Sequence, residues 1–336
     1  MKKLKYLIKC IIYMDYKNLF KTVGTVHNIC GRSRIFLFFD IVYCGLRYGA
    51  GYKDYLLCEW YLLTKAQRET YVTRGINNTI TRLMNNSEYY HIFDNKDEFY
   101  KKFADYIHRE WVFIPETSEE EFEKFMESRD EIVAKPSNES CGIGVEKIKK
   151  SDYPSVSALY KYLVQKGSAI AEDVISQHEL INRINPSSVN TLRIVTILSE
   201  GESHVIYAFI RIGNGDRPVD NINAGGMCAP IDIDTGVITH VGYDKDRITY
   251  KEHPKTGCPI EGYTIPMWKE SVRMCLDAAK VVPEMGYVGW DIAVTPDGPL
   301  LVEGNNLPGH DILQMPPHVP DRIGMLPRFK MFVKGL

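Results

Sequence analysis

The sequence predicts an α+β fold in which a mostly helical N-terminal region precedes a part rich in β-hairpins. Residues 1 to about 85 are poor in proline and rich in Leu, Tyr, Lys and Arg, which favours helices. Beyond about residue 130, short apolar runs alternate with the turn sequences NGD, DTG and PDG, as in antiparallel hairpins. The 336 residues are 44% hydrophobic and 25% charged, which is the composition of a globular protein with a sizeable core.

These patterns divide the chain into four expected regions. Residues 1–90 form the helical N-terminal region, and residues 91–130 supply linker helices. Residues 131–175 predict a small lobe that contains a glycine loop. Residues 176–336 predict a larger lobe of antiparallel hairpins and few helices.

Individual elements follow from periodicity and from turn residues. Apolar side chains recur on one face of residues 94–110, which predicts a helix. Residues 111–116 predict a short strand stopped by Pro115, and residues 117–129 predict an acidic helix. The remaining elements, in chain order, are a strand at 131–136, the loop 137–145, a return strand, a helix at 151–166, strands at 168–175, 192–198, 204–213 and 226–234, a helix around 267–281, and strands at 288–294 and 299–305.

Charge and cysteine content exclude several classes of protein. The formal net charge is −2, so the chain has no overall positive charge that would attract it to nucleic acid. The eight cysteines stand singly without a CxxC pair, which argues against a zinc site or a disulfide framework and favours reduced thiols in the cytoplasm. No apolar stretch reaches the roughly 20 residues that a membrane span requires.

The N-terminal residues are more basic than the rest of the chain. Residues 1–60 carry ten Lys or Arg against four Asp or Glu. Apolar residues recur at helical spacing near the start of the chain, with lysines between them: Leu4, Leu7, Ile8, Ile11 and Ile12. Such a helix either packs on the body of the protein with its basic face in solvent or lies on an anionic membrane surface. We favour packing, and peripheral contact of residues 1–60 with the inner face of a membrane is the alternative.

The most specific cluster of polar residues lies in GWDIAVTPDGPLLVEGNN. A PDG turn joins the strand that carries Asp291 to the strand that ends in Glu303 and Asn305. Residues two apart on a strand share a face, and a hairpin brings Asp291 beside them. Two carboxylates and an amide oxygen are hard ligands that suit Mg²⁺ with bound phosphates. The pattern therefore predicts a magnesium site.

Two further segments predict contacts with a nucleotide. Lys135 ends an apolar strand, and the following loop contains Ser140, Gly142 and Gly144. A lysine supplies a point charge and a glycine loop supplies backbone N–H groups, so this pair can hold phosphates. Further on, the apolar strand in IAEDVISQHE leads into polar residues, which is the arrangement that an adenine and its ribose need.

The order of these three segments resembles that of the ATP-grasp superfamily. More closely, residues 90–315 are similar to the sugar-transfer-associated ATP-grasp family, which is related to carboxylate–amine ligases of the α-L-glutamate ligase type. The segments that carry the resemblance are AKPSNESCGIGV, NPSSVNTLRIVT, NAGGMCAPIDIDTG, HPKTG and VGWDIAVTPDGPLLVEGNNLPG. The first and last segments are general to ATP-grasp proteins. The middle three narrow the resemblance to the sugar-transfer-associated family. The resemblance implies two α+β lobes that clasp ATP.

The resemblance also implies a role for each matching residue. Asp291, Glu303 and Asn305 would hold Mg²⁺. The ATP-binding residues would be Lys96 and Lys135 with Ser140, Gly142 and Gly144 at the phosphates, Glu172 and Val174 at the adenine, and Glu179 at the ribose. Lys96 stands in Asp-Asn-Lys, where the family usually has Asp-Lys, so it is equally well explained as a solvated lysine at a helix start.

Three polar residues that follow the predicted strand at 168–175 have implied catalytic roles. Arg193 and Arg211 interrupt apolar runs, where an unpaired charge is costly. Each is either ion-paired or directed into a site, and the resemblance implies contacts with the γ-phosphate and an acyl phosphate. Asn223 continues that pattern. His253, in KEHPKTG, is interpreted either as a substrate contact or as a turn residue.

The implied activity is ATP-dependent ligation. A substrate carboxylate would attack the γ-phosphorus of ATP, and an amine would then displace phosphate from the acyl phosphate. The expected partners are a small-molecule carboxylate and an amine, sugar-linked acceptors being one option, in surface polysaccharide or natural-product biosynthesis. Two alternatives remain: a phosphotransferase that stops after γ-phosphate transfer, and a non-catalytic nucleotide-binding scaffold.

Overall fold

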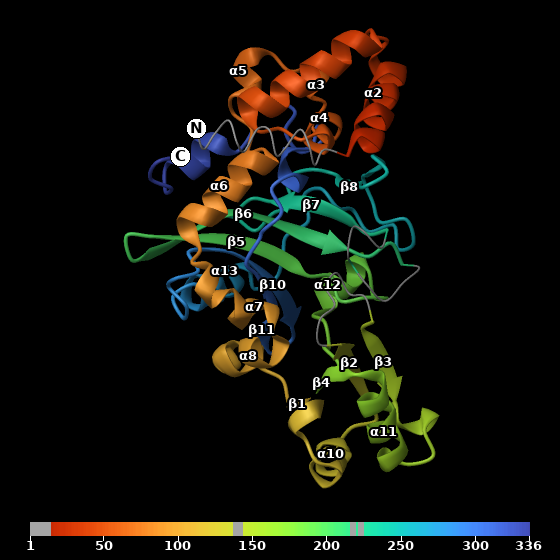
Figure 1. Ribbon diagram of the computed structural model, residues 1–336. Coiled ribbons are helices and arrows are strands. Elements are labelled where there is room, and N and C mark those ends of the chain that lie inside the picture. Colours follow the sequence, from red (N-terminus) through yellow and green to blue (C-terminus); the bar gives the residue numbers. More distant parts are fainter. Residues whose placement is uncertain (1–14, 137–143, 216–219, 221–224) are drawn as a thin grey trace. The chain divides into compact units, whose positions relative to one another are not determined.

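The computed structural model describes residues 15–136, 144–215, 220 and 225–336 (Figure 1). The chain divides into two compact units, of which unit 1 comprises Met1–Leu83 and Gly309–Leu336, and unit 2 comprises Met84–Pro308. The predicted larger lobe extended to residue 336, whereas the segment from Gly309 onward joins the N-terminal residues. The amphipathic pattern at residues 4–12 lies outside the described residues.

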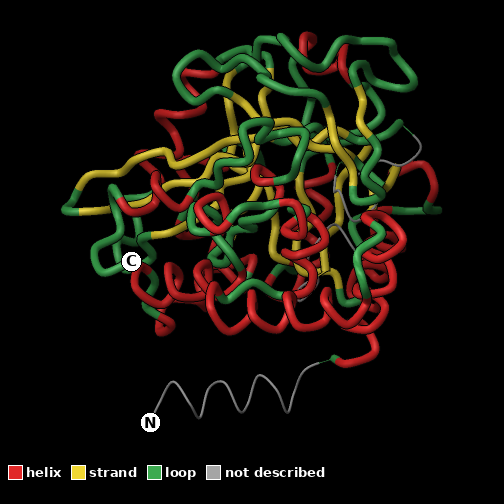
Figure 2. Tube along the Cα trace, turned by 90° about the horizontal axis from the view of Figure 1, so that it is seen from above, coloured by secondary structure: helices red, strands yellow, loops and turns green. Residues whose placement is uncertain are grey.

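Unit 1 is built from helices and connecting loops in its described part, which confirms the helical prediction there. Figure 2 draws the start of the described chain, nearest the end marked N, as a red helix. Its α-helices are α2 (Tyr16–Cys30), α3 (Arg34–Tyr48), α4 (Tyr52–Leu57), α5 (Lys65–Arg68), α6 (Arg74–Met84, which reaches the first residue of unit 2) and α14 (Leu326–Lys330). Two short 3₁₀ helices are η1 (Trp60–Leu62) and η6 (Ile312–Gln314).

The core of unit 1 forms where the apolar stripes of α2 and α3 meet aromatic residues of α4 and η1. Trp60 and Tyr55 are fully buried there. A buried ion pair fixes α3 to α5, because Arg68 donates from Nη1 and Nη2 to the two carboxylate oxygens of Asp40, each over 2.8 Å. Paired hydrogen bonds satisfy both charges inside the unit.

The C-terminal segment closes unit 1 through side chain–backbone hydrogen bonds. Gln314 Oε1 accepts from the N–H of Val72, and Gln314 Nε2 donates to the Val72 carbonyl, each over 2.8 Å. Arg322 pairs with Glu59 over 2.9 Å. These contacts explain why Gly309–Leu336 groups with residues before Met84.

Unit 2 begins with short helices and then forms two antiparallel sheets. The helices and 3₁₀ turns are η2 (Ser87–Tyr89), α7 (Tyr90–Asp94), α8 (Lys96–Lys102), α9 (Ala104–Ile107), η3 (Ile114–Glu116), α10 (Glu119–Met126), η4 (Lys150–Asp152), α11 (Val156–Lys166), α12 (Glu179–Ile184) and α13 (Trp268–Ala278). The predicted helix over 94–110 is divided into α8 and α9 at Phe103, whose ring is buried.

The smaller sheet has four strands in the order β1-β4-β2-β3. These are β1 (Trp111–Phe113), β2 (Glu131–Pro136), β3 (Glu146–Lys149) and β4 (Ser168–Glu172). Helices α10 and α11 cover one face with apolar side chains such as Phe122, Leu159 and Leu163. Every residue of β4 is buried, which agrees with the prediction of a buried strand, and its two end residues, Ser168 and Glu172, are polar.

The larger sheet has seven strands in the order β11-β10-β5-β6-β7-β8-β9. These are β5 (Leu192–Ser199), β6 (Glu202–Ile212), β7 (Met227–Ile231), β8 (Gly242–Asp244), β9 (Thr249–Tyr250), β10 (Tyr287–Thr295) and β11 (Gly298–Asn305). The predicted strands correspond to β5, β6, β7, β10 and β11, whereas β8, β9 and α12 were not predicted because they are short. Trp290 anchors this sheet against Phe93 and Phe103.

Candidate active site

A row of charged residues crosses three strands of the larger sheet. Asp291 on β10 lies directly opposite Arg193 on β5 and directly opposite Glu303 on β11. Directly opposed residues share a face of a sheet, so the three side chains lie on one face. Asn305, two residues after Glu303, faces the same way. Arg211 on β6 joins them, because Phe209 is opposite Arg193 and Arg211 is two residues further along.

Asp291 is held between two guanidinium groups. Its side chain is completely buried, and Arg193 contacts both of its oxygens, with Nη2 lying 3.0 Å from Oδ2. Arg211 Nη2 also contacts Oδ2. Burial alone would raise the pKa of Asp291, but the two arginines hold it well below its ordinary value. Asp291 is therefore an ionised carboxylate that positions both arginines.

Two local features of the strands make room for this row. Gly289 lies beside Arg193, and a Cβ there would come within 3.1 Å of Arg193 Cδ. A β-bulge in β11 follows the Asp291–Glu303 pair, because Ile292 pairs with Leu301 rather than with Val302. The bulge turns Leu301 into the core while Glu303 keeps to the face of Asp291.

Glu303 and Asn305 form the polar edge of the row. Asn305 Nδ2 donates to Glu303 Oε1 over 3.2 Å, and Glu303 remains accessible to solvent. The pKa of Glu303 is raised because the surrounding protein removes water from the carboxyl group, because Asp291 nearby is negatively charged, and because Glu303 and Asp291 share a hydrogen bond. No three His, Cys, Asp or Glu residues in the described part are arranged as a metal site. Two adjacent carboxylates and an amide oxygen nevertheless match what Mg²⁺ needs when phosphates complete its shell.

Arg211 is further fixed by Thr191 and Asp220. Its Nε donates to Thr191 Oγ1 over 2.9 Å, and Thr191 donates in turn to Asp220 Oδ2 over 2.5 Å. The backbone N–H of Thr191 also donates to Asp220 Oδ2 over 2.8 Å. One guanidinium thus spans Asp291 and this second group, which fixes its plane.

A second charged cluster lies on the smaller sheet. Lys135 Nζ on β2 is 2.6 Å from Glu172 Oε1 on β4. Glu172 Oε2 accepts from Arg109 Nε over 3.0 Å and from the Tyr100 hydroxyl over 2.5 Å. Burial alone would raise the pKa of Glu172, but Lys135 and Arg109 lower it to about 2.

Arg109 connects this second cluster to the larger sheet. Its Nη1 donates to the carbonyl of Leu301 on β11 over 2.7 Å, two residues before Glu303. Its side chain is only 3% exposed. Tyr100 bonds both cations, since Lys135 Nζ and Arg109 Nη2 donate to its hydroxyl over 3.0 and 2.6 Å.

Sequence reasoning missed four residues of these clusters: Tyr100, Arg109, Thr191 and Asp220. The available signal for Arg109 was its position two residues before the strand that begins at Trp111, because a charge near the edge of an apolar run needs a partner. Nothing in the sequence distinguishes Tyr100 from the other 20 tyrosines.

The remaining predicted ATP-binding residues have the following positions. Lys96 is the first residue of α8 and half-buried, four residues and hence about one turn before Tyr100. Val174 follows β4 and is half-buried, Glu179 begins α12 and is exposed, and Gly144 precedes β3 with φ of 72°. Ser140, Gly142 and Asn223 lie outside the described residues.

His253 is completely buried and makes hydrogen bonds within the protein. Its Nε2 lies 2.8 Å from the Gly213 carbonyl, and Nδ1 accepts from the N–H groups of Lys255 and Thr256. An Nδ1 that accepts requires the proton on Nε2, which donates to Gly213. This geometry favours the structural interpretation of His253 over a substrate contact.

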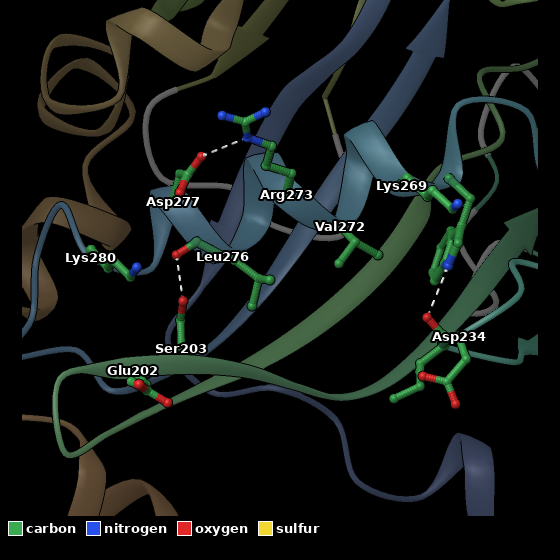
Figure 3. A pocket seen from close by; sticks show the side chains of 11 residues that line it. Glu202, Ser203, Asp234, Lys269, Val272, Arg273, Leu276, Asp277 and Lys280 are labelled. Carbon is green, nitrogen blue, oxygen red and sulfur yellow. Dashed lines mark hydrogen bonds and ion pairs between the residues drawn. The ribbon is translucent and has the colours of Figure 1, made fainter.

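An open pocket lies along α13 (Figure 3), and no residue of the row on the larger sheet lines it. It is lined by charged and apolar side chains, including Asp234, Trp268, Lys269, Arg273 and Lys280. Ser203 donates to the Leu276 carbonyl over 2.8 Å within it. None of the predicted site residues lines this pocket.

Comparison with protein families identifies a match over most of the chain. The family model described as sugar-transfer associated ATP-grasp matches residues 76–328. This match confirms the resemblance, and the mixture of helices and antiparallel sheets agrees with an α+β ATP-grasp fold. No curated protein sequence gives a significant match.

Among solved structures, the similar chains are distant in sequence. An ADP complex of N5-carboxyaminoimidazole ribonucleotide synthetase is 13% identical, with 65% of this chain and 46% of that chain covered and a TM-score of 0.41. This chain thus spans about half the length of that protein. D-cycloserine synthetase is 12% identical, with 76% and 75% covered and a TM-score of 0.43. D-alanine–D-alanine ligase from Bacillus anthracis is 12% identical, with 76% and 73% covered and a TM-score of 0.40.

Proposed function

The chain belongs to the sugar-transfer associated ATP-grasp family, and we propose that it is an ATP-dependent, ADP-forming ligase that joins a carboxylate to an amine. The observation that supports this most strongly is the row Glu303–Asp291–Arg193 with Arg211 beside it. It combines oxygen ligands for a cation with two arginines on one sheet face. Transfer of a phosphoryl group between anions requires both.

The proposed reaction has two steps. A carboxylate oxygen of the first substrate bonds to the γ-phosphorus of ATP while the bond to the β-phosphate oxygen breaks and ADP leaves. The nitrogen of an amine then bonds to the acyl carbon, phosphate leaves, and the amine loses a proton to water. No side chain of the protein becomes covalently bonded, so its residues act by positioning and by charge.

Each cluster has a separate part in this proposal. Asp291, Glu303 and Asn305 would hold Mg²⁺, which lowers the negative charge on the phosphates when bound. Arg193 and Arg211 would face the acyl phosphate. Asp291 keeps both guanidinium groups in place before substrates arrive, which avoids reorganisation during the reaction.

The smaller sheet would hold the nucleotide. Lys135, and Lys96 with it, would contact the phosphates, with Gly144 ending the loop around them. The Glu172 side chain is bound to Lys135 and Arg109, so residue 172 would contact adenine through its backbone. Val174 and Glu179 would complete the adenine and ribose contacts. Ser140, Gly142 and Asn223 remain proposed from the resemblance.

The family description also supports a proposal on the substrate class. We infer that one substrate carries a sugar, because the family is described as associated with sugar transfer. Polysaccharide assembly is the proposed setting. Amino sugars and sugar-linked carboxylates are therefore the first compounds to test.

The experiment is a measurement of ADP release from Mg-ATP by the full chain. Carboxylates are tested in combination with amino sugars and amino acids, and products are identified by mass spectrometry. We expect ADP release that requires both a carboxylate and an amine, together with an amide product. Glu303→Gln should abolish it, whereas Glu202→Gln, on the exposed start of β6, should not.

Other outcomes would favour the alternatives. ADP release with an alcohol alone, giving a phosphate ester, would identify a phosphotransferase. Nucleotide binding without ADP release from any combination would favour a non-catalytic scaffold. Equal activity of Glu303→Gln and the wild type would refute the proposed magnesium site.

A further inference from the structure

The exposed surface of α2 and α3 in unit 1 is unusually apolar. Ile35 is 72% exposed, Phe39 65% and Phe20 59%. The other members of this surface, which we call the α2–α3 apolar face, are Tyr16, Phe36, Tyr43 and Leu46. Contiguous apolar surface rimmed by polar residues marks an interaction site.

The periodicity of α3 shows that this surface is not a by-product of core packing. Residues Leu37, Ile41, Cys44 and Tyr48 form its buried stripe. A second apolar stripe, three or four residues apart, is exposed: Phe36, Phe39, Tyr43 and Leu46. A helix that only covers the core of its own unit needs one stripe.

Helices α2 and α3 lie side by side (Figure 1), and aromatic contacts join them. The ring of Phe20 on α2 stacks on Phe38 of α3, with centroids 5.7 Å apart. Phe38 in turn contacts Phe39 edge-on, with centroids 5.5 Å apart. The apolar face therefore bridges both helices.

The exposed charges around this face are mostly basic, the exceptions being Asp15 directly before α2 and Glu69, whose Oε1 lies 3.8 Å from Arg47 Nη2. Asp40 is the only carboxylate between residues 16 and 48, and Arg68 neutralises it inside the unit. The exposed charged residues on and between the helices are basic: Lys17, Lys21, Arg32, Arg34 and Arg47. Arg32 also lies over the ring of Phe36, 5.7 Å from its centroid. A basic rim around exposed aromatic residues matches the headgroups and acyl boundary of an anionic bilayer.

We propose that the α2–α3 apolar face binds the surface of an anionic lipid membrane. A second copy of the chain fits less well, because a two-fold contact would bring two mostly basic rims together. Residues 1–14 are also a less suitable occupant of this face, because they contain four lysines and no acidic residue and would place positive charge against a basic rim. No helix in the described ranges is long and apolar enough to cross a membrane, so the contact is peripheral.

The experiment is sedimentation of the full chain with two kinds of vesicle. One is phosphatidylcholine alone, and in the other about a third of the lipid is phosphatidylglycerol. We expect binding to the anionic vesicles that weakens as salt is added, because exposed charges are screened. Phe39→Trp should show a blue shift of its fluorescence on those vesicles, relative to the wild type.

Matched variants separate this face from the rest of the molecule. Lys17→Gln/Lys21→Gln/Arg34→Gln should weaken binding about 100-fold, at roughly fivefold for each cation removed near the surface. The triple variant Lys269→Gln/Arg273→Gln/Lys280→Gln, at the pocket along α13, makes the same charge change and should not weaken binding to the vesicles. Phe36→Gln/Phe39→Gln should weaken binding about tenfold or more, as expected when two aromatic rings lose an apolar environment.

Apolar substitutions elsewhere serve as a second control. Met331→Gln and Ile248→Gln change exposed apolar residues outside the face and should leave binding unchanged. Absence of binding to anionic vesicles would overturn the proposal. So would binding that the α2–α3 variants leave intact, or a dimer of the wild type that Phe36→Gln/Phe39→Gln converts to a monomer.

Discussion

Lys135 and Glu172 form a buried ion pair between β2 and β4, with Nζ and Oε1 2.6 Å apart. The resemblance to ATP-grasp proteins implies different parts of a nucleotide site for these residues, the phosphates for the lysine and the adenine for the glutamate. Their contact makes them one unit, to which Arg109 and Tyr100 also belong. The position of the Lys135 ammonium group is therefore set before any nucleotide binds.

Replacing Lys135 should weaken nucleotide binding more than it weakens the fold. Lys135→Met removes the cation but keeps most of the apolar stem, while Arg109 still pairs with Glu172. We expect the Kd for ATP to rise about tenfold or more, as for loss of a charged hydrogen bond. Calorimetric titration measures it. Lys147→Met, on exposed β3 of the same sheet, should bind ATP normally, and equal affinities of the two variants would contradict the phosphate role.

Acid should destabilise the protein partly through Glu172. Its pKa is lowered to about 2 from 4.5, so its contribution to stability is full above about pH 4.5 and is lost as the pH falls toward 2. Glu172→Gln should unfold more easily at neutral pH by about 3 kcal/mol, because two buried cations lose their counter-charge.

The measurement is urea unfolding at neutral pH and at about pH 3. The difference in stability between wild type and Glu172→Gln should shrink in acid. Glu123→Gln, on the exposed side of α10, should have the same free energy of unfolding as the wild type at both pH values. A difference that is independent of pH would show that the ionisation of Glu172 is not its source.

Arg211 should affect turnover more than nucleotide binding. Arg211→Lys keeps the charge but cannot bridge Asp291 and Thr191 with one rigid planar group. We expect kcat to fall by a factor that corresponds to about 2–4 kcal/mol, with the Kd for ATP changed much less. Steady-state kinetics and calorimetry give the two values. If kcat and the affinity for ATP fell in parallel, Arg211 would belong to the nucleotide site instead.

His253 should act on stability and not on substrate affinity. His253→Ala removes the group that bonds the Gly213 carbonyl and leaves a buried cavity. Thermal unfolding should show a loss of about 2–3 kcal/mol. The KM for each substrate should stay near that of the wild type. A raised KM for one substrate at unchanged stability would revive the substrate-contact interpretation.

Gly289 should be sensitive to a single added methyl group. In Gly289→Ala the new Cβ would lie 3.1 Å from Arg193 Cδ and 3.4 Å from Pro308 Cβ. We expect a destabilisation of about 1–3 kcal/mol and a lower kcat, because Arg193 must move. Gly24→Ala, on α2 with open space around it, is the matched control and should not lower kcat. Unchanged kcat in Gly289→Ala would show that Arg193 has room to adjust.

The charged row on the larger sheet could be predicted because strand geometry is local. Side chains alternate with a period of two, and the PDG turn joins neighbouring strands, so Asp291 and Glu303 had to lie close together. Apolar patterns likewise located β4, β5, β6, β10 and β11. The helical character of the N-terminal region followed from composition.

The cluster around Glu172 could not be predicted in the same way. Arg109 and Tyr100 are 63 and 72 residues from it in sequence, and no local pattern encodes such a contact. An arginine at the edge of a strand indicates that some partner exists, but not which one. The pairing of Gln314 with Val72, across 242 residues, escaped prediction for the same reason.

The division of unit 1 into two segments has a consequence for biosynthesis. All of unit 2 leaves the ribosome before Gln314, because translation proceeds from the N-terminus. The backbone groups of Val72 therefore gain their hydrogen bonds to Gln314 only after the segment that follows Pro308 has been made. A product released prematurely after Pro308 would contain the whole of unit 2 and an incomplete unit 1. The structural defect in such a product would lie in unit 1, around Val72, which is far in sequence from the residue where translation stopped.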